Sequence, residues 1–301
     1  MLRFFVVLMA VVVLNACDSK KPELGTKENP IKFFFVPSVD SKLIADKSSV
    51  IKRILEEKTP YKFEIKIPTS YVAVVESFGT KRADIASLNT FGYLLAHQKY
   101  NAQALLTVER HGAYEYKAQI LSATNKDINN LKDLNGKKFA YVDPASTAGY
   151  LMPAKLFKDR NIKPSDTVFA QRHDNVVSMI YQGQVDGGAT FYSPERDGEI
   201  QDARHLVKTQ YPDVEEKVKI LHLTDAIPNE PVVFRAGLSD EMKETVIKAL
   251  LELIKTEEGK DAFYSLYSVT DFKKSSDKEY DKVRKILQAL GRSIDDFVEK
   301  K

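Results

Sequence analysis

The chain has 301 residues, with 45 Lys and Arg against 42 Asp and Glu, a formal net charge of +3. This length suits one large or two modest domains with a sizeable core. Positive and negative charges are nearly balanced, which does not indicate a nucleic-acid-binding domain. Hydrophobic residues at 43% and charged residues at 29% are values typical of a globular protein and exclude a disordered or fibrous chain. The single cysteine excludes a disulfide framework and a thiolate metal cluster.

The only long apolar run lies at the N-terminus, from residue 4 to residue 14, directly after Arg3. A membrane-spanning helix needs about 20 apolar residues, so this run instead fits the hydrophobic region of a signal peptide. It ends in Leu14-Asn15-Ala16-Cys17, which resembles the lipobox of bacterial lipoproteins. We therefore predict a signal peptide over 1–16, lipid attachment at Cys17 and an exported rather than a polytopic protein. The alternative is an ordinary secretory signal followed by an unrelated cysteine.

The segment that follows is predicted to tether the protein to the membrane. Several acyl chains on Cys17 would anchor it durably, because a single chain gives only marginal membrane affinity. In enteric-type lipoproteins an aspartate after the cysteine, here Asp18, implies retention on the periplasmic side of the inner membrane. In an organism with one membrane the same anchor would hold the protein on the outer face of the cell membrane. Residues 17–30 are polar and interrupted by prolines and a glycine, which is typical of a flexible tether.

The first half of the body alternates between strand and helix patterns. Strands are predicted over 31–36, 61–67 and 83–88 from β-rich or alternating residues. Helices are predicted over 40–57, 70–78 and 89–98 from helical spacing and cap residues. This β-α-β-α order predicts an α/β sandwich with a largely parallel sheet.

The second half has the same character. We predict strands over 116–123, 138–142, 167–171 and 184–191, with helices over 146–159 and 175–182. Strands over 218–223 and 231–235 would lead back towards the first domain, and helices over 240–256 and 277–290 would close the chain.

One strand-to-helix junction has the chemistry of an anion site. A predicted strand ends at Asp143-Pro144, and Ser146-Thr147-Ala148-Gly149 opens the next helix. Free amides at a helix start, beside two hydroxyl groups, bind oxyanions readily, although simple helix capping by Ser146 explains the same residues. A second helix start at Pro68-Thr69-Ser70-Tyr71 repeats the chemistry in the other half. Two such starts facing each other across a cleft would hold a small oxyanion.

Several motifs in a fixed order then identify a family. They are Thr69-Ser-Tyr-x-x-x-Val-Glu-x-Phe, Ala83-Asp-Ile-Ala86, Asp143-Pro-x-Ser-Thr-x-Gly-Tyr150, His173-Asp174, Gly183-x-Val-Asp186 and Ile227-Pro-Asn-Glu-Pro231. Together, over about residues 31–270, they resemble the phosphate/phosphite/phosphonate-binding proteins of ABC importers.

The resemblance implies a type II periplasmic-binding-protein fold, with two α/β lobes that each hold a mixed sheet flanked by helices. Two hinge strands would join lobe 1, formed by 31–117 with 231–301, to lobe 2, formed by 118–230. The ligand would close the lobes on itself, a hinge motion, and the closed protein, expected to be a monomer, would dock on the permease and ATPase complex. We also predict no cofactor, no metal site and no nucleic-acid partner.

The same resemblance implies a set of ligand contacts. Tyr71 and Tyr116 would hydrogen-bond or wall the ligand, and Ser146 and Thr147, with the amides of Thr147 and Ala148, would hold phosphoryl oxygens. His173 would donate a further hydrogen bond, and a pKa near neutrality would make binding sensitive to pH. Glu230 would accept from a ligand ammonium or P–OH group, because a buried carboxylate needs a donor nearby.

The chain departs from the family pattern at one position. Relatives that take aminoalkylphosphonates carry a carboxylate seven residues after the Val-Asp aspartate, where it meets the ammonium group of the ligand. Here that position is Ser193, and Glu195 is two residues further on. The change favours phosphite, methylphosphonate or phosphate as ligand over 2-aminoethylphosphonate.

The leading hypothesis is therefore a lipid-anchored binding protein that delivers a phosphorus oxyanion to an importer. A sensor of the same fold that feeds a membrane receptor fits the same residues, and so does a purely structural lipoprotein. An exported phosphohydrolase would need a metal cluster or an activated nucleophile with its base, and the sequence contains neither pattern. We predict that the protein is not an enzyme.

Overall fold

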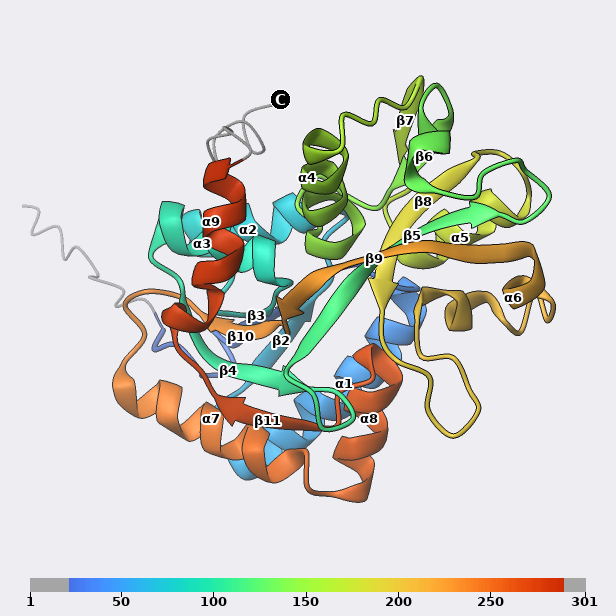
Figure 1. The fold of residues 1–301 in the computed structure, drawn as a ribbon. Helices are drawn as coiled ribbons and strands as arrows, with labels where there is room; N and C mark the ends of the chain where they lie inside the picture. Colours follow the sequence, from blue (N-terminus) through green and yellow to red (C-terminus); the bar gives the residue numbers. More distant parts are fainter. Residues whose placement is uncertain (1–21, 290–301) are drawn as a thin grey trace, which may run out of the picture.

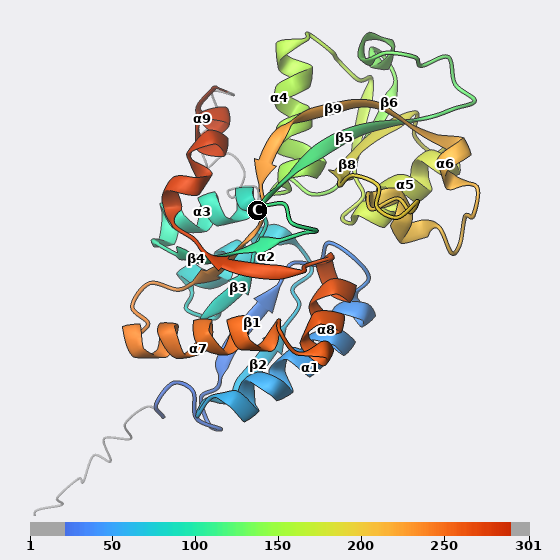
Figure 2. The same cartoon turned by 60° about the horizontal axis from the view of Figure 1, so that its bottom comes forward.

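The computed structural model describes residues 22–289, which form two α/β lobes (Figures 1 and 2). The predicted signal peptide and Cys17 lie outside these residues. Within 22–289, no helix is both long and apolar enough to cross a membrane. Residues 22–30, predicted to belong to a flexible tether, instead form a turn on the first lobe, where the amide of Lys62 donates to the carbonyl of Gly25 at 2.7 Å. The turn depends on Gly25, which has φ +94° and lies against the ring of Tyr61.

The first lobe is built on a six-stranded mixed sheet with the order β11-β4-β10-β3-β1-β2. Strand β1 pairs in parallel with β2 and β3, whereas β10 runs antiparallel to both β3 and β4, and β11 antiparallel to β4. The strand bounds are β1 (Ile31–Phe35), β2 (Phe63–Lys66), β3 (Ile85–Ser87), β4 (Gln103–Glu109), β10 (Pro231–Phe234) and β11 (Asp271–Lys274).

Helices cover both faces of this sheet because β1 is apolar on both sides. Phe33 and Phe35 pack into one core, with α1 (Ser41–Lys58), α7 (Asp240–Leu253) and α8 (Glu257–Tyr267). Phe34 and Val36 point into the opposite core, which holds α2 (Tyr71–Gly79) and α3 (Thr90–Tyr100). The short helix η4 (Asp277–Tyr280) and α9 (Asp281–Ala289) close this side against α3. A strand buried on both faces reads as a continuous apolar run, which is the pattern of residues 31–36.

The second lobe holds a five-stranded mixed sheet with the order β7-β6-β8-β5-β9. Strands β7, β6 and β8 are parallel, and β5 pairs antiparallel with β8 and β9. The bounds are β5 (Glu115–Ala123), β6 (Lys138–Tyr141), β7 (Asp166–Phe169), β8 (Gly187–Tyr192), β9 (Val218–Pro228), η1 (Leu131–Leu134), the π-helical turn η2 (Thr147–Leu151), α4 (Met152–Asp159), α5 (His173–Tyr181), η3 (Ala203–Val207) and α6 (Val214–Lys217).

The chain crosses between the lobes twice, at 110–114 and at 229–230. Figure 2 shows β5 and β9 running side by side from this crossing into the second lobe. The side chain of Asn229 ties the two crossings together, since its Nδ2 donates to the carbonyls of Val108 and Ala113 at 3.1 and 2.9 Å.

Most predicted elements are present, with three differences. The expectation of largely parallel sheets is wrong, because the strands next to the crossings, β4, β5, β9 and β10, run antiparallel to their neighbours. Strand β4, helix α8, strand β11 and the short helices η1, η3 and α6 were not predicted. The helix predicted over 146–159 begins with a π-helical turn before it becomes α-helical. The two-lobed fold with a mixed sheet in each lobe is as the resemblance implied.

Candidate functional site

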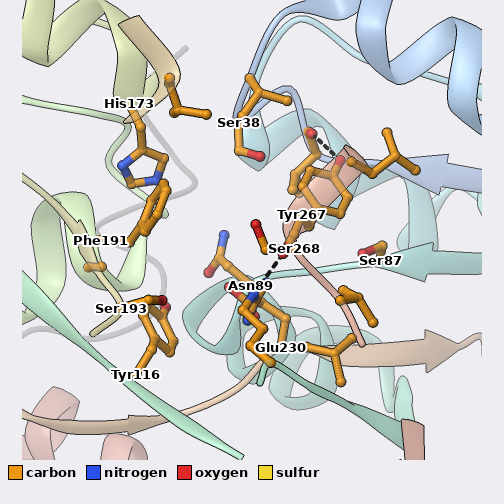
Figure 3. Close-up of a pocket in the computed structure, with 18 of the residues that line it drawn as sticks. Ser38, Ser87, Asn89, Tyr116, His173, Phe191, Ser193, Glu230, Tyr267 and Ser268 are labelled. Atoms are coloured by element: carbon orange, nitrogen blue, oxygen red, sulfur yellow. Dashed lines mark hydrogen bonds and ion pairs between the residues drawn. The ribbon is translucent and has the colours of Figure 1, made fainter. Parts of the chain in front are cut away.

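A cavity of about 290 Å³ lies between the two lobes. Figure 3 shows His173, Phe191, Ser193 and Tyr116 on one side of the cavity, facing Ser38, Asn89, Tyr267 and Glu230 on the other. All seven predicted contact residues line this one cavity: Tyr71, Tyr116, Ser146, Thr147, Ala148, His173 and Glu230. Residues separated by up to 159 positions in the chain are thus brought together by the lobe arrangement, while their contact with a ligand stays a prediction.

The predicted helix start after β6 has the geometry of an anion site. Ser146 is the N-cap of η2, and its Oγ accepts from the amide of Gly149 at 3.1 Å. The capping interpretation of Ser146 is therefore confirmed, but its hydroxyl proton remains available to a ligand. The amides of Thr147 and Ala148 follow as first donors of the helix and have no acceptor within it. Gly149 is required here, because a Cβ at this position would lie 2.4 Å from Cγ2 of Val142.

A third helix start, which the sequence analysis treated only as a cap, meets the first one across the cavity. Asn89 caps α3 by accepting from the amide of Gly92 at 2.8 Å. The hydroxyl of Thr147 accepts from the amide of Phe91 at 2.8 Å and donates to Oδ1 of Asn89 at 3.0 Å. Because its only proton is used in this way, the Thr147 side chain joins the lobes, and only its amide remains to bind a phosphoryl oxygen.

Other contacts also hold the lobes together around the cavity. The amide of Tyr71, the first residue of α2, donates to Oδ2 of Asp143 at 3.4 Å. The amide of His173, the first residue of α5, donates to the carbonyl of Ser38 at 3.3 Å. Arg172 lies 3.5 Å from Asp40, the N-cap of α1. The structure therefore describes the closed arrangement of the lobes.

Three side chains of the cavity lining carry buried polar atoms that have no hydrogen-bond partner among the described residues: Oη of Tyr71, Nδ1 of His173 and Nδ2 of Asn89. The Ser38 hydroxyl approaches that of Tyr71 without completing a hydrogen bond. Buried polar groups are normally paired, and an unpaired one costs about 1–3 kcal/mol. All three side chains line the cavity, so a ligand there would satisfy them.

The protonation states of these groups favour donation to an anion. Burial raises the pKa of Tyr71 well above its ordinary value, and the nearby Asp143 carboxylate adds to the effect. Burial lowers the pKa of His173 to about 3, so its imidazole is neutral at physiological pH. The expectation that this histidine titrates near neutrality is therefore wrong in the structure described, because the ring is enclosed by protein. A neutral imidazole still carries one N–H donor.

Glu230 has the donor that a buried carboxylate requires, and that donor is Arg110, which the sequence analysis missed. Nη1 of Arg110 forms an ion pair with Oε2 of Glu230, and both side chains line the cavity. Tyr116 lies next to them, with its ring centroid 6.0 Å from Cζ of Arg110 and its hydroxyl beside that of Thr147. The need of Glu230 for a donor was the one sequence signal that pointed to such a cation.

The described residues of the lining include few charged side chains. Among the described residues that line the cavity, Arg110 is the only Lys or Arg, so an oxyanion would be held mainly by neutral donors and helix starts. In the described part of the chain, no group of three or more His, Cys, Asp or Glu side chains is placed to hold a metal ion. Ser193, where the resemblance implies a carboxylate in amine-binding relatives, lines the cavity, whereas Glu195 is not among the lining residues.

Comparison with known proteins decides the family. A family model described as the periplasmic substrate-binding protein of phosphonate ABC transporters matches residues 33–280, most of the chain. The chain belongs to this family. Its members are ABC transporter components named for binding and transport rather than for an enzymatic reaction.

Two individual relatives agree with this assignment. The chain is 27% identical over 241 residues to the phosphonates-binding periplasmic protein of Escherichia coli, a match that covers 77% of this chain and 68% of the relative. It is 29% identical over 198 residues to the phosphate-import protein PhnD of Mycolicibacterium smegmatis, a match that covers 60% of this chain and 62% of that relative.

Solved structures of phosphonate-binding proteins share the two-lobed type II fold. One is the binding component of an ABC phosphonate transporter from Pseudomonas aeruginosa, with a TM-score of 0.76 at 19% identity over 85% of each chain. Another is PhnD1 from Prochlorococcus marinus in complex with methylphosphonate, with a TM-score of 0.75 at 17% identity. That match covers 87% of this chain and 98% of the solved one.

Proposed function

We propose that this protein captures a small phosphorus oxyanion between its lobes and delivers it to the permease of an ABC importer. The observation that carries the proposal is the convergence of helix starts and unpaired buried donors on one cavity between the lobes. We further propose that a lipid on Cys17 holds the protein at the outer face of the membrane. The division into lobe 1 (31–117 with 231–301) and lobe 2 (118–230) is part of the same proposal.

In this proposal the phosphoryl group lies at the start of η2. The amides of Thr147 and Ala148 and the hydroxyl of Ser146 donate to its oxygens from the second lobe. Tyr71 donates from the first lobe, and His173 donates through a ring N–H. Helix starts bind anions through free amides and the helix dipole. A ligand held from both sides favours the closed arrangement, because only there do the two sets of donors meet.

The proposed cargo is a phosphonate with a small substituent, phosphite or phosphate. Ser193 offers a hydroxyl where an ammonium group would need a carboxylate. Tyr116 and Glu230 form the wall next to the substituent. The complex of the Prochlorococcus relative with methylphosphonate supports a ligand of this size.

A panel of ligands tests the proposal. The unfolding midpoint of the purified protein is measured with phosphate, phosphite, methylphosphonate, 2-aminoethylphosphonate or sulfate. Calorimetry on fresh samples then gives the Kd of each ligand that raises the midpoint. At 100 times its Kd a ligand adds about 2.7 kcal/mol of stability, which raises the unfolding midpoint by several degrees. The proposal requires such a shift with at least one phosphorus oxyanion. A protein that responds to none of them, or equally to sulfate, contradicts it.

Two matched serines locate the site. Ser146→Ala removes a helix cap and a proposed ligand donor. We expect the Kd of this variant for the phosphorus oxyanion that the wild type binds to rise at least about tenfold. Ser70→Ala removes a comparable cap, since Oγ of Ser70 accepts from the amide of Ala73 at 3.2 Å, but Ser70 does not line the cavity. Its Kd should therefore stay within about threefold of the wild type, although both variants lose about 1 kcal/mol of stability. Equal affinities in the two variants would show that the site is misplaced.

A further inference from the structure

Arg110 holds an unusual position at one end of the cavity. It follows β4 at the first crossing between the lobes, where its backbone exchanges two hydrogen bonds with Ala113, both at 2.9 Å. Its guanidinium donates through Nε to the carbonyl of Tyr267 at 2.7 Å and forms an ion pair with Glu230 through Nη1. The side chains of Arg110 and Glu230 are only 14% and 20% exposed, so this is a largely buried pair.

The two groups that Arg110 contacts are acceptors suited to a cation. Glu230 supplies a carboxylate. Tyr267 is the last residue of α8, whose terminal carbonyls lack donors within the helix and carry the negative end of its dipole. Both residues line the cavity beside Tyr116. An ammonium group on a ligand substituent would seek acceptors of this kind.

The other carboxylate in the lining is also occupied. Asp202 is buried and holds Arg204 in a bidentate contact, with Nε–Oδ1 and Nη2–Oδ2 distances of 3.0 and 2.8 Å. Its Oδ1 also accepts from Nε2 of Gln119 at 3.2 Å. Asp202 and Glu230 are the only acidic side chains among the described residues of the lining, and each is paired with an arginine. The lining therefore offers no unpaired carboxylate to an ammonium group.

We propose that Arg110 is a built-in cation that takes the place of a ligand ammonium, so that the protein selects phosphonates whose substituent is uncharged. This inference rests on the proposed function and deepens it. Arg110 uses the acceptors at the substituent end and opposes a second positive charge there, whereas an alkyl group meets no such penalty. Discrimination of this kind comes from a repulsive element rather than from an added contact.

The test compares 2-aminoethylphosphonate with propylphosphonate, which has a methyl group in place of the ammonium. For the wild-type protein we expect calorimetry to give a Kd at least about tenfold lower for propylphosphonate. In Arg110→Met the carboxylate of Glu230 is released, and the affinity for 2-aminoethylphosphonate should rise at least about tenfold while that for propylphosphonate changes less than about threefold. Adding Glu230→Gln to this variant should abolish the gain.

Controls separate this role from others. Arg196→Met removes an exposed arginine that contacts His111 outside the lining and should change neither affinity. Arg110→Gln, which keeps a polar side chain without the charge, should show the same gain if Arg110→Met fails to fold. Wild-type protein that binds the amine at least as tightly as propylphosphonate overturns the inference. A matched loss of affinity for both ligands in Arg110→Met also overturns it, because Arg110 would then bind the phosphoryl group. If the wild type binds phosphate or phosphite but neither phosphonate, the inference is overturned while the proposed function stands. If it binds no phosphorus oxyanion, the proposed function itself fails.

Discussion

The hydroxyl of Thr147 offers the sharpest test of how the lobes close. It accepts from the amide of Phe91 and donates to Asn89, both on the opposite lobe, and the side chain is fully buried. Thr147→Val keeps the shape of the side chain and removes both hydrogen bonds. Each buried hydrogen bond contributes about 1 kcal/mol, so we expect the closed arrangement to lose about 2 kcal/mol. Since the ligand requires that arrangement, the Kd for a phosphonate should rise about 30-fold.

Calorimetry on three proteins separates closure from folding. Thr147→Ser retains the hydroxyl and should bind within about threefold of the wild type, because it loses only a methyl group. The two hydrogen bonds join the lobes and lie in the core of neither lobe, so Thr147→Val should lower the stability of the ligand-free protein by less than it weakens binding. Equal affinities for the valine and serine variants would refute the reasoning. If ligand-free Thr147→Val loses as much free energy of unfolding as it loses free energy of binding, these hydrogen bonds belong to the fold instead.

Three further outcomes are expected. Burial lowers the folded-state pKa of His173 to about 3, below the ordinary 6.5, so the unfolded state binds the extra proton and the free energy of unfolding falls as the pH drops below 6.5. Between pH 6.5 and 5.0, urea unfolding should show that the wild type loses about 2 kcal/mol more stability than His173→Gln. Equal losses would show that the ring is not buried. Gly149→Ala should lose about 1–3 kcal/mol of unfolding free energy in the same assay, because its Cβ would clash with Val142. A variant as stable as the wild type would show that the helix start relaxes to accommodate the Cβ. Asn89→Asp keeps the cap of α3 but replaces a cavity donor by a negative charge, so calorimetry should give a Kd at least about tenfold higher; unchanged affinity would place the anion elsewhere.

Local patterns were enough to predict the parts of the fold where one strand or helix has a clear apolar face. The apolar run at 31–36 and the cap residues Ser70 and Ser146 predicted their elements to within a few residues. Strand β4 was missed although residues 103–109 are β-rich, and α8 was missed although Thr256 is a cap-type residue and Ala262, Phe263 and Leu266 have helical spacing. The antiparallel strands could not be predicted from alternation, because their direction depends on where the chain crosses between the lobes.

In the candidate site too, local sequence patterns predicted some residues and missed others. Motif positions predicted seven residues that line one cavity, because each lies at a strand end or helix start recognisable in the sequence. Arg110 and the role of Asn89 between the lobes were not predicted. Arg110 lies in an irregular segment without periodicity, and its partners are 120 and 157 positions away in the chain. Such pairings depend on the relative placement of the lobes, which no local pattern reports.

The most direct test of the central claim is a crystal structure of the protein with methylphosphonate. We expect the phosphorus atom between the lobes, with its oxygens accepting hydrogen bonds from the amides of Thr147 and Ala148 and from the hydroxyls of Ser146 and Tyr71. We also expect the methyl group to point towards Tyr116, Arg110 and Glu230. A ligand bound outside this cavity, or inside it with its phosphoryl oxygens on Arg110 and away from the start of η2, would overturn the proposed binding mode.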